Sequence, residues 1–290
     1  MTVAVAGVRV GHWSDPAGET GCTVLTLPEG AVASCEVRGG APASRELDVL
    51  APDKTVSSVD AIVLTGGSAF GLAAADGVMR YLEEQGRGVL TAAGRVPIVP
   101  TMALFDLAAG DPAARPTAEH GYAAARAAAG EQILRGRVGA GTGAYTGQWR
   151  GPQRRPGGIG YAQRTQGDLT VCALCAVNAF GDIDDGRGEI ALDSVAALNT
   201  LFDLEGARTH TTIGAVITNA RLDKTGCYIV AQGAHDGLAR ALTPPHTRYD
   251  GDGFIAAATG SVDAHVDVVR LLALAAVTEA IRSVGATGPA

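Results

Sequence analysis

Aromatic and charged residues are scarce in this chain of 290 residues, at 4 % and 18 % respectively. Hydrophobic residues nevertheless make up 47 %, so the chain can bury a sizeable core and does not resemble a disordered polypeptide. Because large rings are few and 40 residues are glycine, we expect a core of small and β-branched side chains in closely packed sheets and helices. The length is long for one ordinary domain and short for two large ones.

Excess positive charge and long apolar runs are also lacking. The formal net charge is −7, which gives a nucleic-acid partner no electrostatic support. The N-terminal residues lack the basic leader and apolar stretch of a signal peptide. No stretch reaches the roughly 18–20 apolar residues of a membrane span. We therefore expect a soluble, cytoplasmic protein without a membrane or nucleic-acid partner.

The five cysteines are odd in number and irregularly spaced, which does not indicate a disulfide framework. Cys172 and Cys175 form a CxxC pattern, but they lie within the continuous apolar segment 169–177. Such a segment is typical of a buried strand. We therefore expect two small core residues and not a redox or zinc site.

No metal or cofactor is expected from the histidines and acidic residues. His12, His235 and His246 lack the paired spacing of metal ligands, and His235 is interpreted as a structural or interface residue. The acidic segment 182–189 does not match the twelve-residue calcium loop, so a solvated acidic turn is the better interpretation.

Hydrophobic periodicity predicts alternating strands and helices. The second half reads strand, helix, strand, helix, which favours one α/β unit of layered sheets and helices. Pro28 and Gly30 separate two apolar segments and predict a hairpin. Strands are expected at residues 3–10, 22–27, 31–37, 61–64, 169–177, 212–218 and 254–259, and helices at 72–82, 117–129, 193–201, 224–241 and 264–284.

Two glycine-rich segments each permit two interpretations. The turn at residues 65–71 lacks both the dinucleotide and the P-loop pattern, so tight packing is favoured over nucleotide binding, and an anion or carboxylate site stays open. The segment 136–160 is either a flexible surface loop or backbone that approaches a ligand or another subunit closely.

Thr211 and Thr212 stand where a loop enters an apolar strand. A threonine at the first position of such a strand can serve as an N-terminal nucleophile. Its hydroxyl attacks the preceding carbonyl, water opens the resulting ester, and the freed α-amine, with a pKa near about 8, becomes the general base. From spacing alone this is a weak hypothesis, because most such threonine pairs simply lie in a loop that enters a strand.

Motifs along nearly the whole chain resemble the L-aminopeptidase/D-esterase (DmpA-like) family, which includes β-peptidyl aminopeptidases and nylon-oligomer hydrolases. They occur in the family's order: Gly7-Val-Arg-Val-Gly-His12, Leu64-Thr-Gly-Gly-Ser-Ala-Phe-Gly-Leu72, Val99-Pro100, Phe105-Asp106-Leu107, Gly139-Ala-Gly-Thr-Gly-Ala144, Pro156-Gly-Gly-Ile-Gly160, Val177-Asn-Ala-Phe-Gly-Asp182, Thr211-Thr-Ile-Gly214, Ala234-His-Asp-Gly-Leu238 and Tyr249-Asp-Gly-Asp252.

The resemblance implies a four-layer αββα sandwich, as in the DmpA and ornithine acetyltransferase folds. It also implies one domain, 1–290, that cuts itself into chains 1–210 and 211–290. Thr211 matches the nucleophile, Asn178 the oxyanion-holding amide, and Asp250 and Asp252 the two polar positions that orient the nucleophile. The family acts on small peptides or amino-acyl amides and esters and forms homo-oligomers, for which a tetramer is favoured.

Two positions depart from most close relatives, which carry Asn before the nucleophile and Lys in place of Gln148. Here His210 precedes Thr211, and Gln148, expected at the substrate, donates hydrogen bonds without supplying a charge. The departures leave open a processing-deficient, oligomeric binding protein. Transfer of the acyl group to an amine is a third possibility, because ornithine acetyltransferases use a similarly exposed threonine.

Overall fold

The computed structural model describes residues 3–128, 133–187 and 210–286, and the helix expected at 193–201 lies outside them. The described chain forms two five-stranded sheets. The first has the order β1-β2-β5-β8-β4 and the second β11-β12-β14-β16-β3. Their strands are β1 Arg9–Asp15, β2 Thr20–Thr26, β3 Val32–Val37, β4 Ala43–Arg45, β5 Ala61–Thr65, β8 Thr101–Ala103, β11 Gly158–Gln166, β12 Leu169–Asn178, β14 Thr211–Ala220 and β16 Gly253–Val262.

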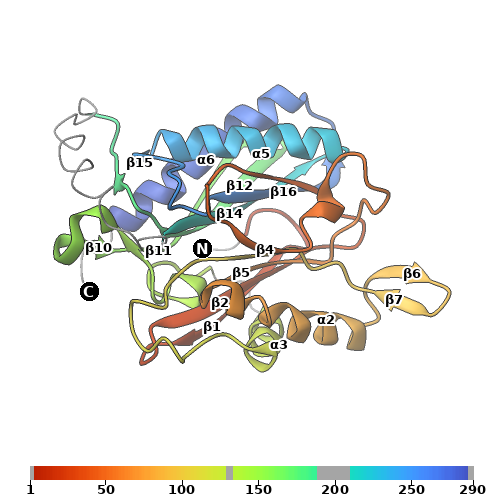
Figure 1. Cartoon of the computed structure of the whole chain (residues 1–290). Helices are drawn as coiled ribbons and strands as arrows, with labels where there is room; N and C mark the ends of the chain where they lie inside the picture. The colour runs from red at the N-terminus through yellow and green to blue at the C-terminus, as the bar shows by residue number, and fades with distance from the viewer. Residues whose placement is uncertain (1–2, 129–132, 188–209, 287–290) are drawn as a thin grey trace.

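Helices cover the outer face of each sheet, as Figure 1 shows. On the first sheet lie α2 and α3, and on the second α5 and α6. The longer helices are α2 Ala74–Glu84, α3 Ala118–Ala127, α5 Lys224–Ala239 and α6 Val266–Ala286, and the shorter ones are α1 Ser68–Gly71, η1 Asp48–Leu50, η2 Gly139–Gly141 and η3 Gln148–Gln153. This is the four-layer αββα sandwich predicted from the sequence.

Three two-stranded ribbons complete the described structure. One of them, β6–β7, extends away from the sandwich beyond α2 (Figure 1). Their strands are β6 Val89–Thr91, β7 Gly94–Val96, β9 Tyr145–Thr146, β10 Arg155–Pro156, β13 Asp182–Ile183 and β15 Leu242–Thr243.

Side-chain alternation along the strands builds the three apolar layers between the four structural layers. In β14, Ile213 and Ile217 face the other sheet, whereas Val216 faces the helices. Cys172 likewise packs between the sheets and Cys175 under the helices, so the two CxxC thiols lie on opposite faces of β12. Both are buried core residues, and burial raises the pKa of the Cys172 thiol to about 12.

Small residues let the helices approach one another closely. A Cβ on Gly77 would lie 1.7 Å from the Ala118 carbonyl oxygen, and a Cβ on Gly121 would lie 1.9 Å from that of Ala74. The backbones of α2 and α3 therefore touch where they cross, which any larger side chain would prevent. Close contact between helix backbones is therefore one reason why the chain contains so many glycines.

Two expectations about the first strands are wrong. The hairpin at Pro28 and Gly30 does not form, because β2 pairs with β1 and β5 whereas β3 pairs with β16 in the other sheet. The first strand runs from Arg9 to Asp15 and not over residues 3–10. The apolar residues Val5 and Val8 are still buried in the core between the sheets, which explains their pattern without a strand.

The glycine-rich segments are close-packed where they precede or follow strands. A Cβ on Gly143 would lie 1.8 Å from the Glu19 carbonyl oxygen, and one on Gly157 2.2 Å from that of Val177. Close approach of backbone is therefore the better interpretation for this part of 136–160. In the described parts of the chain, no helix is both long and apolar enough to cross a membrane.

Candidate active site

Three strand ends meet at one edge of the second sheet. Asn178 ends β12 and is the register partner of Thr211, which begins the antiparallel β14. The parallel β16 begins at Gly253, directly after Asp250 and Asp252, and His210 bridges to Asp250. Sheet pairing thus brings together residues that are far apart in the sequence.

Alternation determines which of the two threonines faces the space between the sheets. Thr211 shares its face of β14 with Ile213, which packs between the sheets, whereas Thr212 shares its face with Val216 under the helices. Asn178 lies on the same face as Thr211, because register partners in a sheet point to the same side. The structure therefore presents Thr211, and not Thr212, beside Asn178.

The Thr211 hydroxyl lies against the peptide bond that precedes it. The side chain is 3 % exposed, and its hydroxyl donates to the His210 carbonyl oxygen. The Gly251 amide lies 3.1 Å from that carbonyl oxygen and 3.2 Å from Thr211 Oγ1, so it can donate to either. A nucleophilic oxygen, an electrophilic carbonyl and a backbone N–H donor are therefore grouped at the His210–Thr211 bond.

Asp250 is a buried carboxylate held by donors from two segments. It accepts from the Phe180 amide at 3.2 Å, and from both the amide and the hydroxyl of Thr247. Burial, and then the negative charge of Asp252, raise the pKa of Asp250 to about 7, against the opposing effect of these hydrogen bonds. Asp250 therefore changes its charge close to neutral pH.

Asp252 is bound to the strand that carries Thr211. Its Oδ1 accepts from the Thr212 amide at 2.7 Å, and its Oδ2 lies 2.9 Å from the Nδ1 of His246. The His246 amide also donates to Oδ2, at 3.1 Å. Among the described residues, the hydroxyl of Thr211 bonds only to His210 and Gly251. Asp250 and Asp252 can therefore influence the Thr211 hydroxyl only through the backbone that they bind and through their charge.

Asn178 and Gln148 form a side-chain pair next to the strand end. Gln148 Nε2 lies 3.0 Å from Asn178 Oδ1, which also accepts from the Tyr145 amide at 3.0 Å. Asn178 Nδ2 donates to the Phe105 carbonyl oxygen, at 2.8 Å, on the side of the first sheet. The amide group is thus held in one orientation, with its acceptor and donor atoms both engaged.

His210 is buried on the other side of the candidate scissile bond, with its ring 5.2 Å from that of Phe180. Burial, and then the positive charge of Arg154, lower the pKa of His210 to about 4. The imidazole is therefore neutral at physiological pH, and the residue before Thr211 adds no charge to the site.

All six residues predicted for the site lie together in the structure: Thr211, Asn178, Asp250, Asp252, His210 and Gln148. The backbone donor Gly251 and the contact of His246 with Asp252 were not predicted from the sequence. The only available signal was proximity in the chain, because His246 lies just upstream of the two aspartates. His246 has a left-handed backbone with φ of +51°, which local sequence does not indicate.

The three histidines considered as a dispersed metal set do not converge. His235 and His246 have ring centroids 4.8 Å apart, but His12 lies elsewhere, with Nδ1 2.9 Å from the Thr23 hydroxyl. Burial above all lowers the pKa of His235 to about 3, so this ring is a neutral core group. In the ranges that the structure describes, no group of three or more histidine, cysteine or acidic residues is arranged to hold a metal ion.

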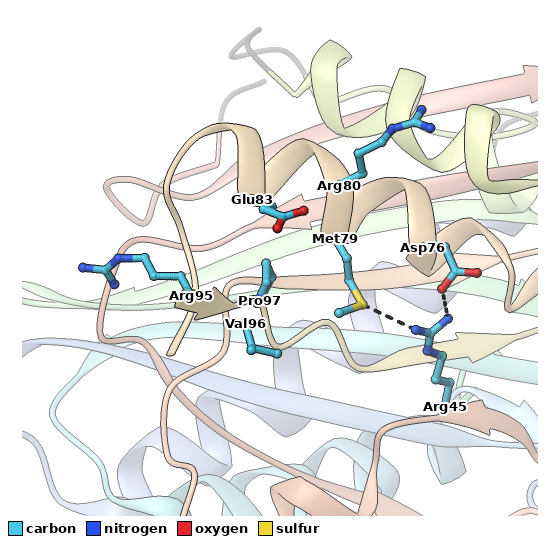
Figure 2. Close-up of a pocket in the computed structure, with 8 residues that line it drawn as sticks. All are labelled: Arg45, Asp76, Met79, Arg80, Glu83, Arg95, Val96 and Pro97. Carbon is cyan, nitrogen blue, oxygen red and sulfur yellow. Dashed lines mark hydrogen bonds and ion pairs between the residues drawn. The ribbon is translucent and has the colours of Figure 1, made fainter. Parts of the chain in front are cut away.

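A surface pocket of about 410 Å³ lies apart from these residues, along α2 and β7 (Figure 2). Arg45 reaches across it to Asp76 at 2.6 Å and to the sulfur of Met79 at 3.4 Å. None of the six predicted site residues lines this pocket. Two arginines of its lining form surface ion pairs, Arg45 with Asp76 and Arg80 with Glu119.

Sequence comparisons show which known proteins this chain is similar to. The model of peptidase family S58 matches residues 3–286. An uncharacterized aminopeptidase of Mycobacterium tuberculosis is 43 % identical over 309 aligned positions, which cover 97 % of this chain and 88 % of the relative. A 6-aminohexanoate-oligomer endohydrolase of Kocuria sp. is 30 % identical, over 89 % of this chain and 74 % of the relative.

Solved structures agree on the fold. A Burkholderia sp. beta-aminopeptidase has a TM-score of 0.74 at 24 % identity, covering 97 % of this chain and 84 % of that chain. The L-aminopeptidase D-Ala-esterase/amidase of Ochrobactrum anthropi, described as a variant of the Ntn hydrolase fold, has a TM-score of 0.73 at 19 % identity with the same coverage. The chain belongs to peptidase family S58 and is a hydrolase of the aminopeptidase type.

Proposed function

We propose that this hydrolase is a self-processing enzyme of the N-terminal-nucleophile type, which cuts its own chain between His210 and Thr211. The Thr211 hydroxyl attacks the His210 carbonyl carbon, and the C–N bond breaks as the Thr211 nitrogen takes up a proton. Water then hydrolyses the ester between Thr211 Oγ1 and His210. The products are chains 1–210 and 211–290, which together make the active unit.

One observation carries the proposal: the Thr211 hydroxyl lies against the His210 carbonyl with the Gly251 amide beside both. Attack turns the carbonyl oxygen into an oxyanion, and an N–H donor already in place stabilises that charge without reorganising. Gly251 itself is needed, because a Cβ there would lie 2.9 Å from Thr211 Oγ1 and 2.8 Å from the Ala41 carbonyl oxygen.

In the processed enzyme, the free amine of Thr211 takes the proton from its own hydroxyl during attack on the substrate carbonyl. Asn178 holds the oxyanion through its side-chain amide, a role that requires Nδ2 to leave the Phe105 carbonyl. Gln148 lies at the substrate, next to Asn178. Asp250 and Asp252 set the charge around the amine and orient β14.

The substrate we propose is a small peptide or amino-acyl amide or ester, cut at the bond next to a free amino group. Aminopeptidases and an oligomer endohydrolase among the relatives support this choice. The buried, negatively charged pair of Asp250 and Asp252 suits a site that receives a cationic amine.

The test is the mass of the purified protein under denaturing conditions. Two fragments that meet at His210 and Thr211 are expected, and Thr211→Ala should leave the chain intact. Thr212→Val is the matched control, because the Thr212 hydroxyl is buried without a hydrogen-bond partner in the described structure and the valine is isosteric. A wild-type chain that stays whole after long incubation would sink the proposal.

We further propose that the processed pairs assemble as a homo-oligomer in the cytoplasm, with a tetramer as the favoured size. Light scattering on the processed protein checks the size, and a mass of a single pair would contradict the assembly.

A further inference from the structure

The Tyr145 ring lies next to two guanidinium groups that differ in their partners. The Cζ atom of Arg154 is 3.8 Å from the ring centroid and that of Arg137 is 4.9 Å away. Arg137 forms an ion pair with Glu19, whose carboxylate also lies 3.2 Å from the Tyr145 hydroxyl. The Arg154 side chain has no hydrogen bond or ion pair with any residue that the structure describes. One of the two cations is therefore compensated and the other is not.

Arg154 is held near the reacting groups by short contacts. The Tyr145 amide donates to Asn178 Oδ1 at 3.0 Å, and Asn178 is the register partner of Thr211. The next residue, Arg155, pairs with Thr146 in the β9–β10 ribbon, which fixes the backbone beside Arg154. The positive charge of Arg154 also lowers the pKa of His210, in addition to the effect of burial.

Arg137 and Arg150, in the same neighbourhood, each have a carboxylate partner. Arg150, on the 3-10 helix η3 that ends just before Arg154, makes three hydrogen bonds of 2.7–3.0 Å with Asp182 and also stacks on Trp149. Arg154 is partly buried and keeps its five N–H donors without such a partner. A planar guanidinium that rests on an aromatic ring and leaves its fork of donors open is well suited to bind a carboxylate in a bidentate manner.

We propose that Arg154 binds the free carboxylate of the substrate's leaving part. This rests on the proposed function, and it narrows the substrate class to short peptides that end in a carboxylate soon after the bond that is cut. The acidic pair Asp250 and Asp252 then faces the amino end of the substrate, and Arg154 faces its carboxyl end. Binding both charged ends favours dipeptide-like molecules over long chains or blocked ends.

The experiment compares two dipeptides, alanyl-alanine and β-alanyl-alanine, each with its own C-terminal amide. The wild-type enzyme is expected to have a KM about tenfold lower for the free acid than for the amide. Arg154→Gln should raise the KM for the acid about tenfold, leave kcat within twofold, and leave the KM for the amide unchanged. Arg154→Lys, which keeps the charge but loses the fork, should recover part of the difference.

Arg155→Gln is the matched control, because Arg155 is exposed and adjacent but makes no cation–π contact with the Tyr145 ring in the described structure. If Arg154→Gln weakens acid and amide equally, Arg154 acts only by supporting Tyr145 and the proposal is wrong. A wild-type enzyme that does not distinguish acid from amide also overturns it.

Calorimetric binding of the same acid and amide pairs separates this proposal from the proposed function. If wild type shows no Thr211-dependent turnover, the proposed function fails, while Arg154-dependent preference for the acid in binding still supports the carboxylate site. If turnover is present but the binding preference is absent, only the carboxylate site fails.

Discussion

Two regions of the molecule bury carboxylates at strand ends, one in each sheet. Asp106 follows β8 in the first sheet, and it accepts from the Thr20 hydroxyl at 2.8 Å and the Gly67 amide at 2.6 Å. Asp250 and Asp252 precede β16 in the second sheet. Burial is the main cause that raises the pKa of Asp106 to about 6 and that of Asp250 to about 7.

The difference lies in what the donors connect. Both donors to Asp106 come from the first sheet and its turn, so the carboxylate closes the glycine-rich segment 65–71. For that segment tight packing was favoured and a carboxylate site was left open, and the carboxylate bound there is the chain's own Asp106. Asp250 and Asp252 repel each other and bind donors from three separate segments around Thr211. A single satisfied carboxylate supports the structure locally, whereas a repelling pair is costly and typical of a functional site.

The largest effect is expected for Asp252→Asn. The oxygen of the new carboxamide can still accept from the Thr212 amide. The negative charge is lost, and the carboxamide NH₂ group then faces the N–H of the His246 amide, so two donors meet. We expect turnover, and the rate of cleavage before Thr211, to fall about 10²-fold, as for a lost oxyanion donor. Asp263→Asn, on an exposed surface pair, is the control. A variant that matches wild type in single-turnover assays would place the catalytic charge elsewhere.

A smaller effect, visible mainly in the pH profile, is expected for Asp250→Asn. The pKa of Asp250 is raised to about 7, so its carboxylate forms as the pH rises through neutrality. Hydrolysis by wild type should therefore increase between about pH 6 and pH 8, with a further inflection from the freed α-amine near about pH 8. The variant should keep only the amine's inflection. An unchanged profile would show that Asp250 does not control the reaction.

The smallest effect on the reaction is expected for Asp106→Asn, which should change stability instead. Since the pKa of Asp106 is raised from 3.8 to about 6, the folded chain binds this proton more tightly than the unfolded chain. Its contribution to stability is present below about pH 4 and is lost as the pH rises through about 6, by about 3 kcal/mol. Chemical denaturation at pH 4 and pH 7 measures the free energy of unfolding of wild type and variant. The wild-type value minus the variant value should fall by that amount between the two pH values. The rate of cleavage before Thr211 in the variant should stay within a few-fold of the wild-type rate. A larger loss of cleavage than of stability would contradict a purely structural role.

The elements with long, regular patterns were predictable. Apolar spacing located β12, α5 and α6 to within a few residues, because each has to bury a continuous face. The turn at Gly30 was read correctly as a turn but wrongly as a hairpin. Turn chemistry reverses the chain, but it does not decide whether the next strand joins the same sheet or, like β3, the other one.

The candidate site also has a part that the sequence predicted and a part that it did not. Thr211, Asn178, Asp250 and Asp252 were identified through motifs and resemblance, and they lie together at one sheet edge, while their catalytic roles stay a prediction. The contact of Asp252 with His246 and the donor at Gly251 were not predictable. They depend on a left-handed backbone at residue 246 and on a backbone amide, and a backbone amide carries no residue-specific signal.

The sequence by itself determined the family motifs, the alternation of apolar residues along each strand, and the presence of a threonine where a strand begins. The tertiary structure alone decided which sheet each strand joins, that Thr211 and not Thr212 faces Asn178, and that Asp250 titrates near neutral pH. Local patterns follow from the covalent periodicity of helices and strands. Pairing, burial and pKa instead depend on groups brought together from distant parts of the chain, whose desolvation and charge no local window contains.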